Sequence, residues 1–231
     1  MIEDGITGVC ISRDKQKLDL GIPFISYTKN YQPILHRDNT DLQRISYLNQ
    51  RYNDAIREAL THYPSTKHLL IIDHYYLPFI AALHRLINDY RSQDRVILGG
   101  SVWYWVKVRI RPWIAYYDIL SVPEFAGKRW YGTGRLPLGI IPVTGVGAVW
   151  IVPRLVWERS NGFGVPSPPQ AGGSRCLDTS GYQVLLDCDS RFWRTKATNP
   201  ELPVLPMSKR IINTGKGVQR KLLRMIGRKS L

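Results

Sequence analysis

A run of four apolar residues, Leu69 to Ile72, is followed at once by the acid Asp73 and then by His74 and Tyr75. The run is too short to cross a membrane, and it is typical of a central strand that is covered on both faces, as in a parallel sheet. Ligands of α/β folds bind beyond the carboxyl ends of such strands. We therefore expect Asp73 at a ligand-binding edge, although an aspartate that caps the next helix fits the spacing equally well.

The segments on either side of this run alternate between helix and strand patterns. Apolar residues recur every three or four positions from Thr40 to His62, which is the period of a helix with one buried face. A second helix is expected from about Pro78 to Tyr90, followed by a strand from Val96 to Leu98 that ends at Gly99-Gly100. A strand, a helix and a strand in this order predict a right-handed βαβ unit within an α/β fold.

The rest of the chain offers weaker signals. Between Ser101 and Tyr131 large aromatic residues are frequent, and Val106 to Arg111 alternates apolar with basic side chains. This alternation predicts a strand with one cationic face, which could bind single-stranded nucleic acid or simply cover an aromatic core. Asn161 to Gly173 predicts a loop, and Gly181 to Asp187 predicts a last strand. Near the start of the chain, Ile22 to Tyr27 is a candidate for the first strand of a nucleotide-binding fold.

The charge of the chain is strongly positive. Lys and Arg number 32 against 18 Asp and Glu in 231 residues, for a formal net charge of +14. This excess predicts an anionic partner: nucleic acid, an acidic membrane surface or a phosphorylated small molecule. More than half of it lies in a tail after Met207, which predicts either a basic amphipathic helix on anionic lipid or a solvated terminus. We divide the chain accordingly into a domain, residues 1–206, and a tail, residues 207–231.

The cysteines and the hydropathy suggest where the protein is found. Cys10, Cys176 and Cys188 are odd in number and lack the spacing of a zinc site, so reduced thiols are expected. The chain has no uncharged run long enough for a membrane span and no signal-peptide pattern at its amino terminus. We expect a cytoplasmic protein that could associate with the membrane surface through its tail.

Three segments follow one another in an order that resembles the GT-A glycosyltransferases, especially the family-two-like enzymes that use nucleotide sugars. Asn53 lies in a helix before the strand that ends at Asp73, the glycine-rich run Thr144 to Arg154 follows, and Gly181 to Asp189 closes the pattern. The resemblance covers roughly residues 40–195. It implies a GT-A (Rossmann-like) fold with a mixed, mostly parallel sheet flanked by helices. It also implies transfer of a sugar from a nucleotide-sugar donor to a glycan, lipid or protein acceptor.

The resemblance assigns roles to individual residues. Asp73 would contact the ribose or hold Mg²⁺ or Mn²⁺, with His74 as a nitrogen ligand, because Tyr75 stands where the family has a second acid. Asp178 is the acid nearest to the family's base and is nominated as the catalytic base, with a surface aspartate as the alternative. Independently of the resemblance, the excess of positive charge motivates Arg129 and Arg135 as candidates to hold the diphosphate in place of a metal. The full donor-binding set is Asn53, Asp73, Tyr75, Gly145, Gly147, Arg129 and Arg135.

Two other functions remain consistent with the sequence. The main rival is a nucleic-acid-binding protein that uses the basic strand and the tail, although no established nucleic-acid-binding module is recognisable. The absent second acid and the absent base also fit a glycosyltransferase-like protein that has lost catalysis. Nucleic acid is the less favoured partner.

Overall fold

A computed structural model of the protein describes residues 5–12, 14–29, 41–73, 76–107, 112–116, 138–164 and 173–194. These residues belong to one unit, residues 1–200, within the expected domain 1–206. The expected tail, residues 207–231, lies outside the described residues. The elements are β1 (Ile6–Ile11), β2 (Phe24–Tyr27), α1 (Asp41–His62), β3 (His68–Asp73), α2 (Ile80–Arg91), β4 (Val96–Lys107), β5 (Pro112–Tyr116), β6 (Ile140–Pro142), β7 (Val149–Pro153), α3 (Arg154–Arg159), the 3-10 turn η4 (Gly173–Cys176) and β8 (Gln183–Arg194).

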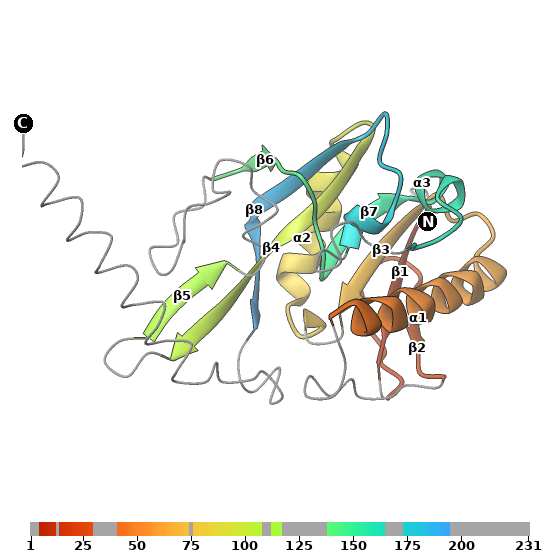
Figure 1. Ribbon diagram of the computed structural model, residues 1–231, viewed down its shortest axis with the longest axis horizontal. Coiled ribbons are helices and arrows are strands. Elements are labelled where there is room, and N and C mark those ends of the chain that lie inside the picture. The colour runs from red at the N-terminus through yellow and green to blue at the C-terminus, as the bar shows by residue number, and fades with distance from the viewer. Residues whose placement is uncertain are drawn as a thin grey trace, which may run out of the picture. The chain divides into compact units, whose positions relative to one another are not determined.

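The described strands form one mixed sheet, which confirms the α/β class (Figure 1). Their order is β2-β1-β3-β7-β4-β8-β6, and β5 pairs with β4 outside this path. The pairs β1–β2, β1–β3 and β4–β8 are parallel. The pairs β3–β7, β4–β7, β4–β5 and β6–β8 are antiparallel. The sheet is therefore less parallel than the resemblance implied.

The expected unit of strand, helix and strand is present as β3, α2 and β4, but its two strands are not neighbours. Strand β7 lies between them and runs antiparallel to both. Leu70 pairs with Ile151 on one side of β7, and Leu98 pairs with the same residue on the other side. Leu70, Ile151 and Leu98 therefore lie side by side across the three strands. This register fixes the positions of β4 and β7 residues relative to Asp73 at the end of β3.

Alternate residues of the strands face two separate cores. Leu69 and Ile71 pack with α1 and α3 on one face, whereas Leu70 and Ile72 pack with α2 on the other. All four side chains are 0 to 2% exposed, so β3 is covered on both faces, as its unbroken apolar run predicts. Figure 1 shows α1 and α2 on opposite sides of the sheet.

The prediction that Gly99-Gly100 ends a strand is wrong, because β4 continues through both glycines. A Cβ on Gly99 would lie 2.5 Å from the Cβ of Val146, and one on Gly100 would lie 2.3 Å from a ring carbon of Phe192. The two glycines therefore give room to large side chains on opposite faces of the strand. Gly99 and Gly100 are therefore needed for the packing of Val146 and Phe192, and they do not form a turn.

The amino-terminal region differs from the expectation as well. The first described strand is β1, which pairs with both β2 and β3, and Phe24–Tyr27 forms β2 at the edge of the described sheet. All six residues of β1 are buried although Thr7, Gly8 and Cys10 are not strongly apolar. Among the helices of the described ranges, none has the length and apolar character that a membrane crossing requires.

Candidate functional site

The carboxyl ends of β1, β2 and β3 meet at one edge of the sheet. Ile11 pairs with Tyr27 on one side and with Asp73 on the other. Just beyond, the backbone N–H of Ser12 donates to the carbonyl oxygen of Tyr27 at 3.0 Å, and the hydroxyls of Ser12 and Ser26 are 2.6 Å apart. We call this edge, with Ser12, Asp14, Ser26 and Asp73, the strand-end edge. It is the edge at which open α/β sheets bind ligands.

A second segment, remote in sequence, is held against Asp73. The backbone N–H of Asp73 donates to the carbonyl oxygen of Ala148 at 2.8 Å, directly beyond the pairing of Ile72 with Val149. Ala148 has a φ of 62°, a left-handed conformation that is strained for a residue with a side chain. We call Thr144–Ala148 the glycine segment. Its last residue and the acid at the end of β3 are thus adjacent.

The turn η4 packs on the glycine segment from the other side. Val146 and Ser174 exchange two hydrogen bonds: the N–H of Ser174 donates to the Val146 carbonyl at 2.8 Å, and the N–H of Val146 donates to the Ser174 hydroxyl at 2.9 Å. Arg175 donates to the hydroxyl of Thr144 at 2.7 Å. A Cβ on Gly145 would lie 2.7 Å from Nε of Arg175, so this glycine makes room for the arginine.

Of the two glycines nominated for donor binding, only Gly145 is explained by packing against residues that the structure describes. Within the described residues, the nearest atom to a Cβ on Gly147 would be the Cα of Gly173 at 3.8 Å, an ordinary contact distance. Gly147 instead accepts, through its carbonyl oxygen, a hydrogen bond from the N–H of Val149 at 2.7 Å. The described residues therefore leave room for a side chain at Gly147 but not at Gly145.

Asn53, also nominated for donor binding, is occupied with a structural role. Its carboxamide oxygen accepts from the indole N–H of Trp157 at 3.0 Å and from the backbone N–H of Phe163 at 2.8 Å, and its amide donates to the Phe163 carbonyl at 3.2 Å. Both lone pairs of the oxygen are then in use. Asn53 fastens α1 to α3 and to the loop that follows α3.

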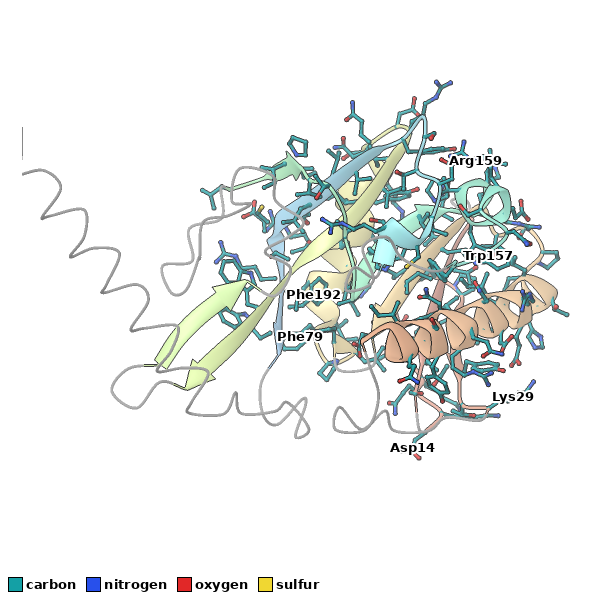
Figure 2. The ribbon with its side chains drawn as sticks, viewed as in Figure 1. Asp14, Lys29, Phe79, Trp157, Arg159 and Phe192 are labelled. Atoms are coloured by element: carbon teal, nitrogen blue, oxygen red, sulfur yellow. The ribbon has the colours of Figure 1, made fainter. Side chains whose placement is uncertain are left out.

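Asp178, the nominated base, lies near the amino-terminal ends of β4 and β8, whereas Asp73 lies at the carboxyl end of β3. Its carboxylate pairs with Arg159 of α3 at 3.1 Å and accepts from the N–H of Ser180 at 3.0 Å. The turn that it forms leads into β8, whose first residue pairs with the first residue of β4. In Figure 2, Arg159 lies near the top of the sheet and Asp14 of the strand-end edge near the bottom. The hydrogen bonds of Ser180 and the charge of Arg159 hold the pKa of Asp178 below its ordinary value.

The remaining nominated residues, His74, Tyr75, Arg129 and Arg135, lie outside the described residues. In the ranges that the structure describes, no group of three His, Cys, Asp or Glu side chains is arranged to hold a metal ion. The described donors at the strand-end edge thus fall short of a site for Mg²⁺ or Mn²⁺, and a metal stays a prediction. The basic strand Val106 to Arg111 also lies largely outside the described residues.

Sequence reasoning missed Arg175 as a residue of this site, and it did not predict the strained backbone at Ala148. Arg175 brings a cation to the glycine segment, and Ala148 holds a strained backbone beside Asp73. The sequence carried one signal for Arg175, because it lies shortly after Gly172-Gly173 and near Asp178, the acid nominated as the base. Behind the edge, burial and then the charge of Asp73 raise the pKa of the Cys10 thiol well above its ordinary value, so this cysteine is unreactive.

Comparisons of the sequence with protein-family models and with curated proteins give no match. The residues of the strand-end edge and the glycine segment are therefore the basis on which a function is proposed.

Proposed function

We propose that the protein is a glycosyltransferase of the GT-A type that binds a nucleotide-sugar donor at the strand-end edge. One observation carries the proposal. Asp73 and the glycine segment, which the resemblance nominates independently at distant points of the sequence, are joined by the hydrogen bond from Asp73 to Ala148. The location supports the proposal further, because the carboxyl edge of an α/β sheet is where such folds bind nucleotides.

The residues of this edge suit the chemical groups of such a donor. The Asp73 carboxylate can accept hydrogen bonds from ribose or sugar hydroxyls. The hydroxyls of Ser12 and Ser26 bond to each other and to the carbonyl oxygen of Asp14, and thereby hold the strand-end edge together. Arg175, held by Thr144 at 2.7 Å, is a cation for the diphosphate, because a guanidinium matches phosphate oxygens in geometry and charge. We therefore add Arg175 to Arg129 and Arg135 as a residue proposed to bind the diphosphate.

Transfer requires that the acceptor hydroxyl lose a proton and that the charge on the leaving diphosphate be balanced. Asp178 was nominated for the first task, but its ion pair with Arg159 and its lowered pKa make it a weak base. Arginine side chains can perform the second task. Mg²⁺ or Mn²⁺ would supply the same neutralisation where bound, and a rate of transfer unchanged by EDTA would exclude that requirement.

The first experiment is thermal unfolding in the presence of UDP- and GDP-sugars. A ligand that binds only the folded state stabilises it by about 2.7 kcal/mol at a concentration of 100 times its Kd. We expect one donor to raise the Tm of the wild type and of the control variant Asp94→Asn, and to have no effect on Asp73→Asn. Asp94 is an exposed carboxylate in the turn after α2, so this control matches the change in charge.

The outcomes separate the competing functions. A donor-specific shift with turnover supports the transferase, and a shift without turnover supports a glycosyltransferase-like protein that has lost catalysis. Tight, salt-sensitive binding of oligonucleotides without a response to any nucleotide sugar would support the nucleic-acid-binding rival and contradict our proposal.

The acceptor is proposed to be a glycan, lipid or protein, and a lipid-linked acceptor would bring the enzyme to a membrane surface. The basic tail, residues 207–231, is the proposed contact with anionic lipid. Flotation with liposomes that contain anionic lipid should be lost when the chain is truncated after Pro206. Equal flotation of the two proteins would exclude the tail as the anchor.

A further inference from the structure

Helix α3 ends in a turn whose two backbone hydrogen bonds define a Schellman motif. The N–H of Gly162 donates to the carbonyl oxygen of Trp157 at 2.9 Å. The N–H of Asn161 donates to the carbonyl oxygen of Glu158, also at 2.9 Å. Asn161 occupies the left-handed position of the motif with a φ of 54°, and Gly162 follows with a φ of 85°. Glycine is the usual residue at the left-handed position and asparagine is the alternative, so the motif here has an asparagine directly before a glycine.

The asparagine and the glycine form a chemically reactive pair. Asn161-Gly162 is the only Asn-Gly sequence in the chain. In such a pair the backbone nitrogen of the glycine can attack the carboxamide carbon of the asparagine, because glycine has no side chain to obstruct the approach. Asparagine is accordingly a thermolabile residue. Asn161 is also exposed, so water has access to the products of such an attack.

The folded turn opposes this attack. The N–H of Gly162, which would have to lose its proton, is held by the carbonyl oxygen of Trp157. Gly162 is buried against Asn53, since a Cβ on this glycine would lie 2.7 Å from Oδ1 of the Asn53 side chain. The same oxygen accepts from the indole N–H of Trp157 at 3.0 Å and from the N–H of Phe163 at 2.8 Å. Residues on both sides of the reactive pair are thus fixed, and the attack requires the turn to open.

We propose that Asn161 is a site of spontaneous deamidation, and that the Schellman motif and its fastening by Asn53 keep the reaction slow in the folded protein. In the reaction the nitrogen of Gly162 bonds to the carboxamide carbon of Asn161 and gives up its proton, while the side-chain nitrogen leaves as ammonia. Water then opens the resulting succinimide ring at one of its two carbonyl carbons. The product is aspartate or isoaspartate, and water is the reactant that the solvent supplies.

Both products weaken the end of α3. Each adds a negative charge beside the last carbonyl groups of the helix, where such a charge is unfavourable. Isoaspartate also adds one carbon atom to the main chain, so that the hydrogen bond from Gly162 to Trp157 loses its geometry. The bond from Phe163 to Asn53 depends on the same turn. Deamidation therefore damages the junction of α1 and α3 irreversibly.

The test follows deamidation by peptide mapping and mass spectrometry during incubation at pH 8. Asn88 of α2 is the internal control, because it is also exposed but precedes Asp89, whose side chain obstructs the attack. We expect Asn161 to react slowly in the folded wild type and rapidly in urea, whereas Asn88 reacts slowly in both. The rate follows the population of the open turn. In folded Asn53→Leu it should therefore rise by about 5- to 150-fold, which corresponds to a loss of about 1–3 kcal/mol in holding the turn closed.

Three results would overturn the proposal. A rate at Asn161 no higher than that at Asn88 in urea would exclude the site. Equal rates at Asn161 in the folded wild type and in urea would exclude protection by the turn, and this comparison does not require Asn53→Leu to fold. An unchanged rate in folded Asn53→Leu would contradict the role of Asn53.

A second measurement tests the effect of the modification on the fold. Asn161→Gly has a residue suited to the left-handed position and no carboxamide. Prolonged incubation at pH 8 should lower the Tm of the wild type and leave the Tm of Asn161→Gly unchanged. Equal losses of Tm in the two proteins would contradict the proposed damage to the end of α3.

Discussion

Replacing Gly173 with alanine tests how tightly η4 is packed on the glycine segment. Gly173 has a φ of 65°, and a Cβ at this position would lie 2.0 Å from the carbonyl oxygen of Val146. Alanine pays about 1–2 kcal/mol for the left-handed backbone alone. Relief of the overlap by movement of the neighbouring backbone adds about 1–3 kcal/mol. We therefore expect Gly173→Ala to lower the free energy of unfolding by about 2–5 kcal/mol.

The chain contains a matched control for this substitution. Gly21 has the same φ of 65°, and a Cβ there would meet no atom of the described residues within 4 Å. Gly21→Ala therefore carries the backbone cost without the overlap. In a domain of this size the overlap should separate the Tm values of the two variants by about 2–12 °C. Equal Tm values, with unchanged denaturant m-values, would refute the close packing of Gly173 against Val146.

Three further substitutions have definite expected results. Phe192→Ala empties a site that is 0% exposed, between Phe79 and Tyr76, and should cost about 3–5 kcal/mol in urea unfolding, whereas Phe192→Leu should cost clearly less. Asn53→Leu leaves the indole N–H of Trp157 without the partner that it has at 3.0 Å and should destabilise by at least about 1–3 kcal/mol; a neutral result would contradict its fastening role. The lowered pKa of Asp178 means that its contribution to stability is present above pH 3.8 and is lost as pH falls below it, so Tm between pH 5 and pH 2 should fall more steeply in the wild type than in Asp178→Asn.

The sequence predicts those elements whose stability depends on local periodicity. The apolar spacing of α1 and the unbroken run of β3 identify both elements within one or two residues. Strand β1 escapes prediction because Thr7, Gly8 and Cys10 dilute its apolar pattern, and it is buried through pairing with strands on both sides. Gly99-Gly100 reads as a turn in sequence because the side chains that require these glycines, those of Val146 and Phe192, come from distant segments.

The same distinction between local patterns and contacts of distant segments applies to the residues of the candidate site. The position of Asp73 at the end of β3 could be predicted from sequence because a strand end is a local feature, whereas the site roles of Asp73 and the glycine segment stay predictions. Asn53 could not be judged, since Trp157 and Phe163, which take up its side chain, lie more than a hundred positions further on. The distance of Asp178 from Asp73 depends on the register of β8 with β4, which no local pattern specifies.

The antiparallel strand in the middle of the sheet has a consequence for how the protein is made on the ribosome. Strand β7 follows α2, β4, β5 and β6 in the chain, yet it fills the space between β3 and β4. A nascent chain that ends before Val149 therefore carries β2-β1-β3 and the pair β4-β5 with unpaired edges on β3 and β4, because β8 has not been made either. Such edges are prone to pair with other chains. Release from the ribosome or binding by a chaperone during this interval should decide the yield of native protein, because the sheet is complete only after β7 has paired with β3 and β4 and β8 has paired with β4 and β6.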